Sequence, residues 1–167
     1  FIMAGTPNRE IFKNILHALP EAGADIIEVG MPFSDPMADG DIIQEAGAHA
    51  LKNGQILEKT LHDISDFKIK YLHIPIVLMG YYNPIYTYGS ENFILDAEKY
   101  GCDGLIIVDL PPEEKNDIMP LLNSNQIDFI RLITPTTSLE RLNFIQEQAS
   151  GFLYYVSVAG VTGKKSA

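Results

Sequence analysis

Hydrophobic residues along the chain gather in short runs rich in β-branched side chains, and longer amphipathic stretches separate these runs. Apolar runs of about four to eight residues bounded by turn signals are typical of buried strands. Both faces of such strands are apolar when helices cover the sheet, which fits the composition of the runs. The strands predicted in this way span residues 1–4, 26–29, 75–79, 104–108, 129–133 and 152–156.

The stretches between the runs repeat apolar residues at helical spacing, as Ile11, Ile15 and Leu19 do in the first of them. A long crossover between consecutive strands favours parallel pairing. We therefore expect the six strands to be parallel neighbours in chain order around a common interior. One long interval has room for an extra helix between Gly40 and Gly54, and Pro20 should end or kink the first helix.

Six strand–helix units fit either an open doubly wound sheet or part of a closed barrel, and periodicity alone does not choose between them. No G-x-G-x-x-G motif follows the first strand, which argues against a doubly wound sheet that binds a dinucleotide. A closed (β/α)8 TIM barrel typically needs about 200 to 250 residues. On the barrel interpretation, residues 1–167 form a single domain that holds strands 1 to 6. The last two units and a short N-terminal segment would then be missing from it.

The charge balance excludes some kinds of partner. The chain has 12 basic and 22 acidic residues and a net charge of −10, which argues against a nucleic-acid or anionic-membrane surface. No apolar run approaches the roughly 18 residues of a membrane span. A single cysteine, Cys102, excludes an intrachain disulfide, is expected to be a small buried hydrophobe and fits the reducing cytoplasm. The four histidines are not spaced as metal ligands, so we expect no metal.

Glu28 is the first candidate for chemistry, because it lies inside a β-branched strand. Alternation places Ile27 and Val29 on one face and Glu28 on the other. A carboxylate withdrawn from water must be paired or have a raised pKa, and a raised pKa suits a general acid or base. The alternative is a structural glutamate that caps a neighbouring loop or pairs with a buried cation.

Two loops carry further candidates. Residues 31–40 contain two prolines and two aspartates and follow the second strand, at the end where barrel active sites are built. Asp35 and Asp39 are the candidate carboxylates there, although either could form an Asx-turn or cap a helix that begins near Gly40. Residues 156–163 follow the last predicted strand, and their glycines would let backbone N–H groups approach an oxyanion or hinge a lid. A plain turn is the alternative.

Taken in order, the motifs resemble those of a known family. The block Phe33-Ser34-Asp35-Pro36 is followed by Ala38-Asp39-Gly40 and preceded by Glu28-Val29-Gly30. Further blocks are Tyr81-Tyr82-Asn83-Pro84, Asp109 to Glu114, Pro135-Thr136-Thr137 and Tyr154 to Gly163. Their order and spacing over residues 1–163 resemble the alpha subunits of tryptophan synthase. One departure is Thr6, where an aspartate is common; we expect it to cap the first helix.

The resemblance implies a TIM barrel and a lyase that cleaves indole-3-glycerol phosphate to indole and glyceraldehyde 3-phosphate, with no cofactor in this chain. Glu28 falls on the family's general acid/base and Asp39 on its second catalytic carboxylate. Substrate-binding positions would be Phe1, Met79, Tyr81, Asp109, Tyr154, Thr162 and Gly163, the last two in a mobile loop with Gly163 at the phosphate. The family's other phosphate-binding loops, after strands 7 and 8, are absent from the sequence.

The resemblance also implies a partner, a pyridoxal-phosphate beta subunit, in a heterotetramer of two alpha and two beta chains. The positions that map to this interface are Pro32, Asp35, Pro36, Asn83, Tyr86 and Pro111. Two alternatives stay open. The chain could be a catalytically weak subunit that mainly docks on and activates the beta subunit, or a different phosphate-handling barrel enzyme.

Overall fold

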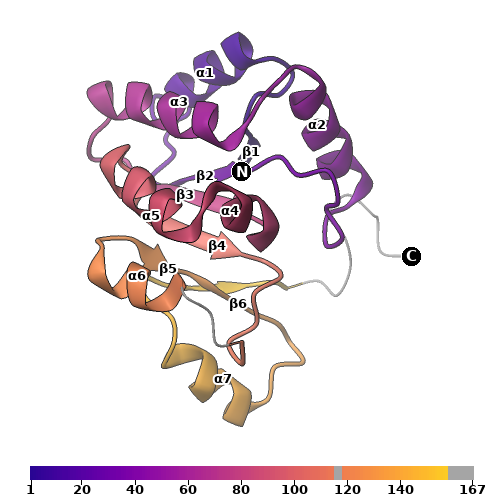
Figure 1. The fold of residues 1–167 in the computed structure, drawn as a ribbon, viewed down its shortest axis with the longest axis vertical. Coiled ribbons are helices and arrows are strands. Elements are labelled where there is room, and N and C mark those ends of the chain that lie inside the picture. Colours follow the sequence, from indigo (N-terminus) through magenta and orange to yellow (C-terminus); the bar gives the residue numbers. More distant parts are fainter. Residues whose placement is uncertain (115–117, 158–167) are drawn as a thin grey trace.

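The computed structural model describes residues 1–114 and 118–157 (Figure 1). A five-stranded parallel sheet runs in the order β1-β2-β3-β4-β5, and β6 pairs with β7, also in parallel. All neighbouring strands in this part of the chain are consecutive and parallel, as the sequence predicts. The strands are β1 (Ile2–Met3), β2 (Ile27–Gly30), β3 (Ile76–Gly80), β4 (Gly104–Ile107), β5 (Asp128–Phe129), β6 (Arg131–Ile133) and β7 (Leu153–Tyr155).

Helices connect the strands and cover the outer face of the sheet. Figure 1 shows the strands following one another down the middle of the molecule, with α1 and α3 near β1 and α7 near β6. The extra helix expected after Gly40 is present as α2. The helices are α1 (Arg9–Ala18), α2 (Asp41–Lys52), α3 (Leu57–Lys70), α4 (Tyr82–Tyr88), α5 (Ser90–Lys99), α6 (Ile118–Ser124) and α7 (Leu139–Gln146).

The fifth predicted strand, 129–133, is divided at Ile130. The Ile130 N–H still donates to the carbonyl oxygen of Leu105 on β4, at 3.0 Å. From Arg131 onward the backbone pairs with β7 instead. The same run of residues therefore joins the five-stranded sheet to the pair β6–β7.

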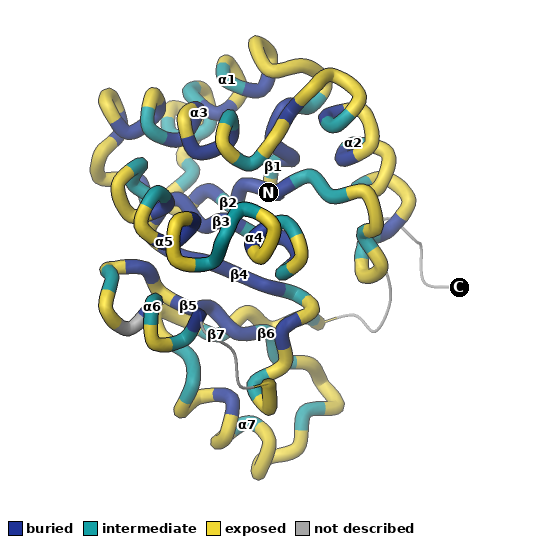
Figure 2. The backbone as a smooth tube through the Cα atoms, viewed as in Figure 1, coloured by how far each residue is buried: buried dark blue, intermediate teal, exposed yellow. Residues whose placement is uncertain are grey.

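The two faces of the strands serve different purposes. Ile27, Val29 and Leu78 point into the large core between the sheet and the helices. The opposite face carries a smaller apolar cluster built from Val77, Ile106 and Ile130, with Met79, Val108 and Leu132 packed against it. Figure 2 shows the burial along the strands and the exposure of the helices' outward sides. Glu28 lies on this second face, which carries the smaller cluster and faces the interior of the barrel.

The first helix departs from the sequence expectation at its start and follows it at its end. Asn8, not Thr6, is the N-cap: its side-chain oxygen accepts from the Ile11 N–H at 2.9 Å. The expectation for Thr6 is wrong because the helix begins two residues too late for it, and its hydroxyl donates to the Ala46 carbonyl oxygen. Helix α1 ends at Ala18, before Pro20.

Candidate active site

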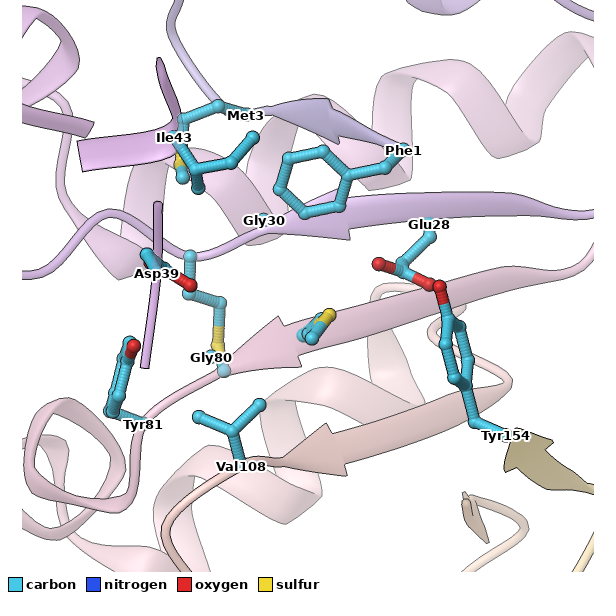
Figure 3. A pocket seen from close by; sticks show the side chains of 12 residues that line it. Phe1, Met3, Glu28, Gly30, Asp39, Ile43, Gly80, Tyr81, Val108 and Tyr154 are labelled. Atoms are coloured by element: carbon cyan, nitrogen blue, oxygen red, sulfur yellow. The ribbon is translucent and has the colours of Figure 1, made fainter. Parts of the chain in front are cut away.

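A cavity of about 180 Å³ opens where the first strands end (Figure 3). Active sites of parallel α/β folds lie at the carboxyl ends of the strands, so its position is the expected one. Glu28 and Asp39 both line it, as do four of the predicted substrate-binding residues. The complete lining is Phe1, Met3, Glu28, Gly30, Met31, Asp39, Ile43, Met79, Gly80, Tyr81, Val108 and Tyr154.

Glu28 reaches the cavity from the middle of β2 and is half-buried. Among the described residues its carboxylate has neither a hydrogen-bond nor an ion-pair partner, so it caps no loop and pairs with no buried cation there. Burial raises the pKa of Glu28. A half-buried carboxyl without a fixed partner is suited to exchanging a proton.

Tyr154, on β7, completes this side of the cavity. Its hydroxyl and the Glu28 carboxylate point toward one another in Figure 3. The negative charge of Glu28 raises the pKa of Tyr154, and burial adds to the effect. The phenol is therefore neutral at physiological pH and available as a hydrogen-bond donor.

Asp39 reaches the cavity from the loop 31–40. The N-cap of α2 is Gly40, and no side chain forms a cap hydrogen bond there, so the alternative of a capping role for Asp39 is excluded. Its backbone oxygen accepts from the Gln44 amide at 2.8 Å, which leaves the carboxylate for the cavity. Burial raises the pKa of Asp39, and a hydrogen bond from Tyr81 opposes the rise.

The other loop aspartate, Asp35, is exposed and accepts a hydrogen bond from the Ser34 hydroxyl. It takes no part in lining the cavity. Of the two loop carboxylates weighed from the sequence, only Asp39 therefore faces the site.

The remaining walls are apolar or glycine. Phe1 and Met79 were predicted there, whereas Met3, Gly30, Met31, Ile43, Gly80 and Val108 were not singled out. Strand alternation could have identified two of them, because residues two apart lie on the same face of a strand. Gly30 lies two residues after Glu28, and Val108 lies two residues after Ile106, which is on the same face of the sheet as Glu28. Nothing in the local pattern marks Ile43, which arrives on α2.

Three predicted substrate-binding residues are not in this lining. Asp109 is exposed and follows β4 outside the cavity; its carboxylate accepts from the Tyr82 N–H at 2.8 Å, at the first residue of α4. Thr162 and Gly163 lie outside the described residues. The loop expected to close over the substrate is therefore not placed by the structure.

The residues predicted to face a partner follow β2, β3 and β4 and so lie at the same edge of the sheet as the cavity. Asp35, Asn83, Tyr86 and Pro111 are exposed, Tyr86 by 68%, while Pro32 and Pro36 are partly exposed. Residues 1–114 and 118–157 contain no helix long and apolar enough to cross a membrane. In the same residues no three acidic, histidine or cysteine side chains converge as metal ligands.

Comparison with known proteins gives a consistent result. Residues 1–167 match a family model described as the tryptophan synthase alpha chain. A tryptophan synthase alpha chain from Granulibacter bethesdensis is 53% identical over 167 residues, which is all of this chain and 60% of the relative.

Solved structures agree with the family match. Subunit alpha from Legionella pneumophila has a TM-score of 0.90 at 44% identity, covering 93% of this chain and 60% of its own. A structure of the two-alpha, two-beta tryptophan synthase complex from Pyrococcus furiosus gives 0.89 at 42%, covering 98% and 66%. The chain thus spans about 60% of the length of the Granulibacter bethesdensis and Legionella pneumophila alpha chains. With the parallel strand order, these similarities confirm the predicted TIM-barrel fold class.

Proposed function

The chain belongs to the tryptophan synthase alpha chain family, and on that premise we propose that its whole protein cleaves indole-3-glycerol phosphate to indole and glyceraldehyde 3-phosphate. The observation that carries the proposal is the pair Glu28 and Asp39, whose carboxylates enter one largely apolar cavity and have raised pKa values. The apolar walls, among them Phe1 and Met79, suit an indole ring.

The reaction is a retro-aldol cleavage of the bond between indole C3 and the glycerol side chain. An indole anion is a poor leaving group, so C3 must first gain a proton. The ring then becomes an indolenine whose nitrogen carries positive charge. Asp39, as a carboxylate beside the ring N–H, stabilises this charge in a largely apolar site.

Glu28 supplies the proton transfers. In its neutral form, which burial favours, it delivers a proton to C3. As a carboxylate it then takes the proton from the hydroxyl on the carbon that becomes the aldehyde. The C–C bond breaks, its electrons return to the ring, and indole leaves with Glu28 protonated again. Each such acid or base step is worth roughly a hundred- to ten-thousandfold in rate.

No lysine or arginine lines the described part of the cavity, so we expect backbone N–H groups rather than side-chain cations to bind the phosphate. We assign it to backbone N–H groups of the segment with Thr162 and Gly163, which also closes over the substrate. Asp109, whose carboxylate accepts from the N–H of Tyr82 at the first residue of α4, is assigned to the glycerol side of the substrate.

The partner proposal rests on position. Exposed residues at the cavity end of the barrel, such as Asp35 and Tyr86, would dock on the pyridoxal-phosphate beta subunit in a heterotetramer. A related complex from Pyrococcus furiosus shows an alpha chain of this fold in such an assembly. Pyridoxal phosphate would belong to the beta subunit alone, and the protein would work in the cytoplasm. The intact carboxylate pair speaks against a merely docking subunit.

A substrate screen on the complete polypeptide tests the proposal. Indole-3-glycerol phosphate should release free indole, and addition of the beta subunit should speed the release. Other phosphorylated compounds, offered as substrates of a different phosphate-handling barrel enzyme, should not react. Turnover of one of those compounds, with no indole formed, would replace this proposal by the different-barrel alternative.

A further inference from the structure

Tyr81 lies between the end of β3 and the start of α4 and is 2% exposed. Its hydroxyl oxygen accepts a hydrogen bond from the Ala38 N–H at 2.9 Å. Its ring lies against Phe33, with 5.5 Å between the ring centroids. Phe33 and Ala38 both belong to the loop 31–40, so Tyr81 holds that loop at two points, one of them next to Asp39.

The hydrogen-bonding capacity of a phenol identifies its second partner. A tyrosine hydroxyl has one proton to donate and lone pairs with which to accept. The Ala38 N–H occupies a lone pair, which leaves the proton for the neighbouring carboxylate of Asp39. Figure 3 shows the Tyr81 hydroxyl and the Asp39 side chain facing one another, at the opposite end of the cavity from Glu28 and Tyr154.

A hydrogen bond from the segment after β4 also holds the backbone next to Tyr81. The Asp109 carboxylate, after β4, accepts from the Tyr82 N–H at 2.8 Å and so holds the first turn of α4. Burial of the Tyr81 ring restrains its rotamer further. The hydroxyl is thus held by rigid elements, whereas Asp39 is carried by a loop.

We propose that Tyr81 is a positioning residue that orients the loop-borne carboxylate of Asp39 toward the ring nitrogen of the substrate. The kinetic consequence rests on the function proposed above, but the structural relation between the two side chains does not. The mechanism above requires Asp39 to be ionised when positive charge develops, and a donated hydrogen bond stabilises the ionised form.

Titratable groups lie on the elements around Asp39, but among the described residues only the Tyr81 hydroxyl bonds to its carboxylate. Tyr81 reaches Asp39 from the residue after β3, and Glu28 lies across the cavity on β2. Asp109 follows β4 outside the cavity, and Asp41 begins α2 on the exposed side. Tyr81 is the group whose hydrogen bond lowers the pKa of Asp39, against the effect of burial. Removing that hydroxyl should therefore raise the pKa.

The substitution Tyr81→Phe removes the hydroxyl and keeps the ring against Phe33. In the complete polypeptide we would titrate the aspartate carboxyl carbons by ¹³C NMR, with Asp39 assigned from the signal lost in Asp39→Asn. The pKa of Asp39 should rise in Tyr81→Phe. The kcat for indole release should fall about tenfold, the scale of one hydrogen bond to a charged group, while KM stays within about twofold.

Tyr88→Phe is the matched control, because the Tyr88 hydroxyl also donates to a carboxylate, that of Asp96, at 2.7 Å on the outer side of the barrel. It should leave both the Asp39 titration and kcat unchanged. An unchanged Asp39 titration in Tyr81→Phe would overturn the positioning role. A shifted Asp39 titration in Tyr81→Phe, together with no indole release by the natural protein, would support the positioning role and overturn the proposed function instead.

Discussion

Glu28 and Asp39 face one cavity, but their carboxylates are held in different ways. Glu28 projects from β2 and has no hydrogen-bond partner among the described residues, so burial raises its pKa with little opposition. Asp39 has the Tyr81 hydroxyl beside it, which counteracts burial. Surroundings that act differently on two carboxyl groups separate acid–base roles from electrostatic ones. This difference supports Glu28 as the proton carrier and Asp39 as the ionised stabiliser.

The raised pKa of Glu28 has a consequence for stability that does not depend on the reaction. A carboxyl whose pKa is higher in the folded than in the unfolded state costs stability once the pH passes its unfolded value, about 4.3. The cost grows until the pH exceeds the folded value and then stays constant. Glu28→Gln removes the titration, so the variant should be more stable than the natural chain at pH 7.

Urea unfolding of both proteins at several pH values measures this effect. The stability difference should shrink as the pH falls and be small below pH about 4, where Glu28 is neutral in both states. A glutamine variant that is less stable at pH 7 would mean that the Glu28 carboxylate has a favourable partner in solution.

Single residues were predictable to different degrees. Strand alternation was enough to place Glu28 on the opposite face from Ile27 and Val29. The sequence around Cys102 was enough to predict a buried hydrophobe, which its 4% exposure confirms. The missing partner of Glu28 could not be predicted, because it depends on what every other element places nearby. Local sequence equally left open whether Asp39 caps α2 or faces the cavity.

At the scale of elements, two strands end in glycines that make the cavity possible. A Cβ on Gly30 would lie 2.6 Å from the Phe1 ring, and one on Gly80 would lie 2.8 Å from the Met31 side chain. Neither glycine needs an unusual backbone conformation, so each is required for space. The glycines let neighbouring apolar side chains lie across β2 and β3 as the walls of the cavity.

The pair Gly30→Ala and Gly47→Ala tests this spatial role. The alanine at position 30 should displace Phe1 and raise the KM for indole-3-glycerol phosphate roughly tenfold, the scale of one misplaced methyl group in an apolar pocket. Gly47, inside α2, has room for a methyl group, with Met3 at 3.7 Å. Its replacement should stabilise the fold by roughly 0.5–1 kcal/mol without changing KM. Equal KM values for both variants would show that Gly30 is not limiting.

The loop after β2 gives a second prediction at this scale. Asp35 is exposed beside the cavity, so Asp35→Lys should weaken the complex with the beta subunit while the barrel stays folded. Asp25 is exposed just before β2, at the amino-terminal ends of the strands and away from the cavity, so Asp25→Lys is the control. Titration against the beta subunit, followed by its pyridoxal-phosphate activity, measures both. Unchanged activation by Asp35→Lys would place the interface elsewhere.

The elements themselves followed from hydrophobic periodicity, because the predicted strands and the extra helix α2 are present in the structure. Some details did not follow, among them the presence of two helices, α4 and α5, between β3 and β4. The division of 129–133 arises because Ile130 bonds to β4 while Arg131 to Ile133 pair with β7. The start of α1 at Asn8 depends on which side-chain oxygen reaches a free N–H, and composition alone does not determine that.

For the whole molecule, the curvature of the strands brings distant parts of the chain together. Tyr154 on β7 faces Glu28 on β2, and Ile43 arrives from α2 (Figure 3). Such meetings could be predicted only through the family resemblance, which carried Tyr154 but not Ile43. The order of parallel strands agrees with the solved alpha chains at a TM-score of 0.90, although the chain spans 60% of their length.

The central claim is that Glu28 and Asp39 act together on one bound substrate. Its most direct test is the rate of indole release by the complete polypeptide carrying Glu28→Gln or Asp39→Asn, with Asp25→Asn, at an exposed position away from the cavity, as the control. Each cavity variant should lose at least about a hundredfold in kcat, because a positioned acid/base or electrostatic group is removed with little change in volume. The control should keep the natural rate. Indole release by Glu28→Gln at a rate comparable to the natural protein would contradict the account.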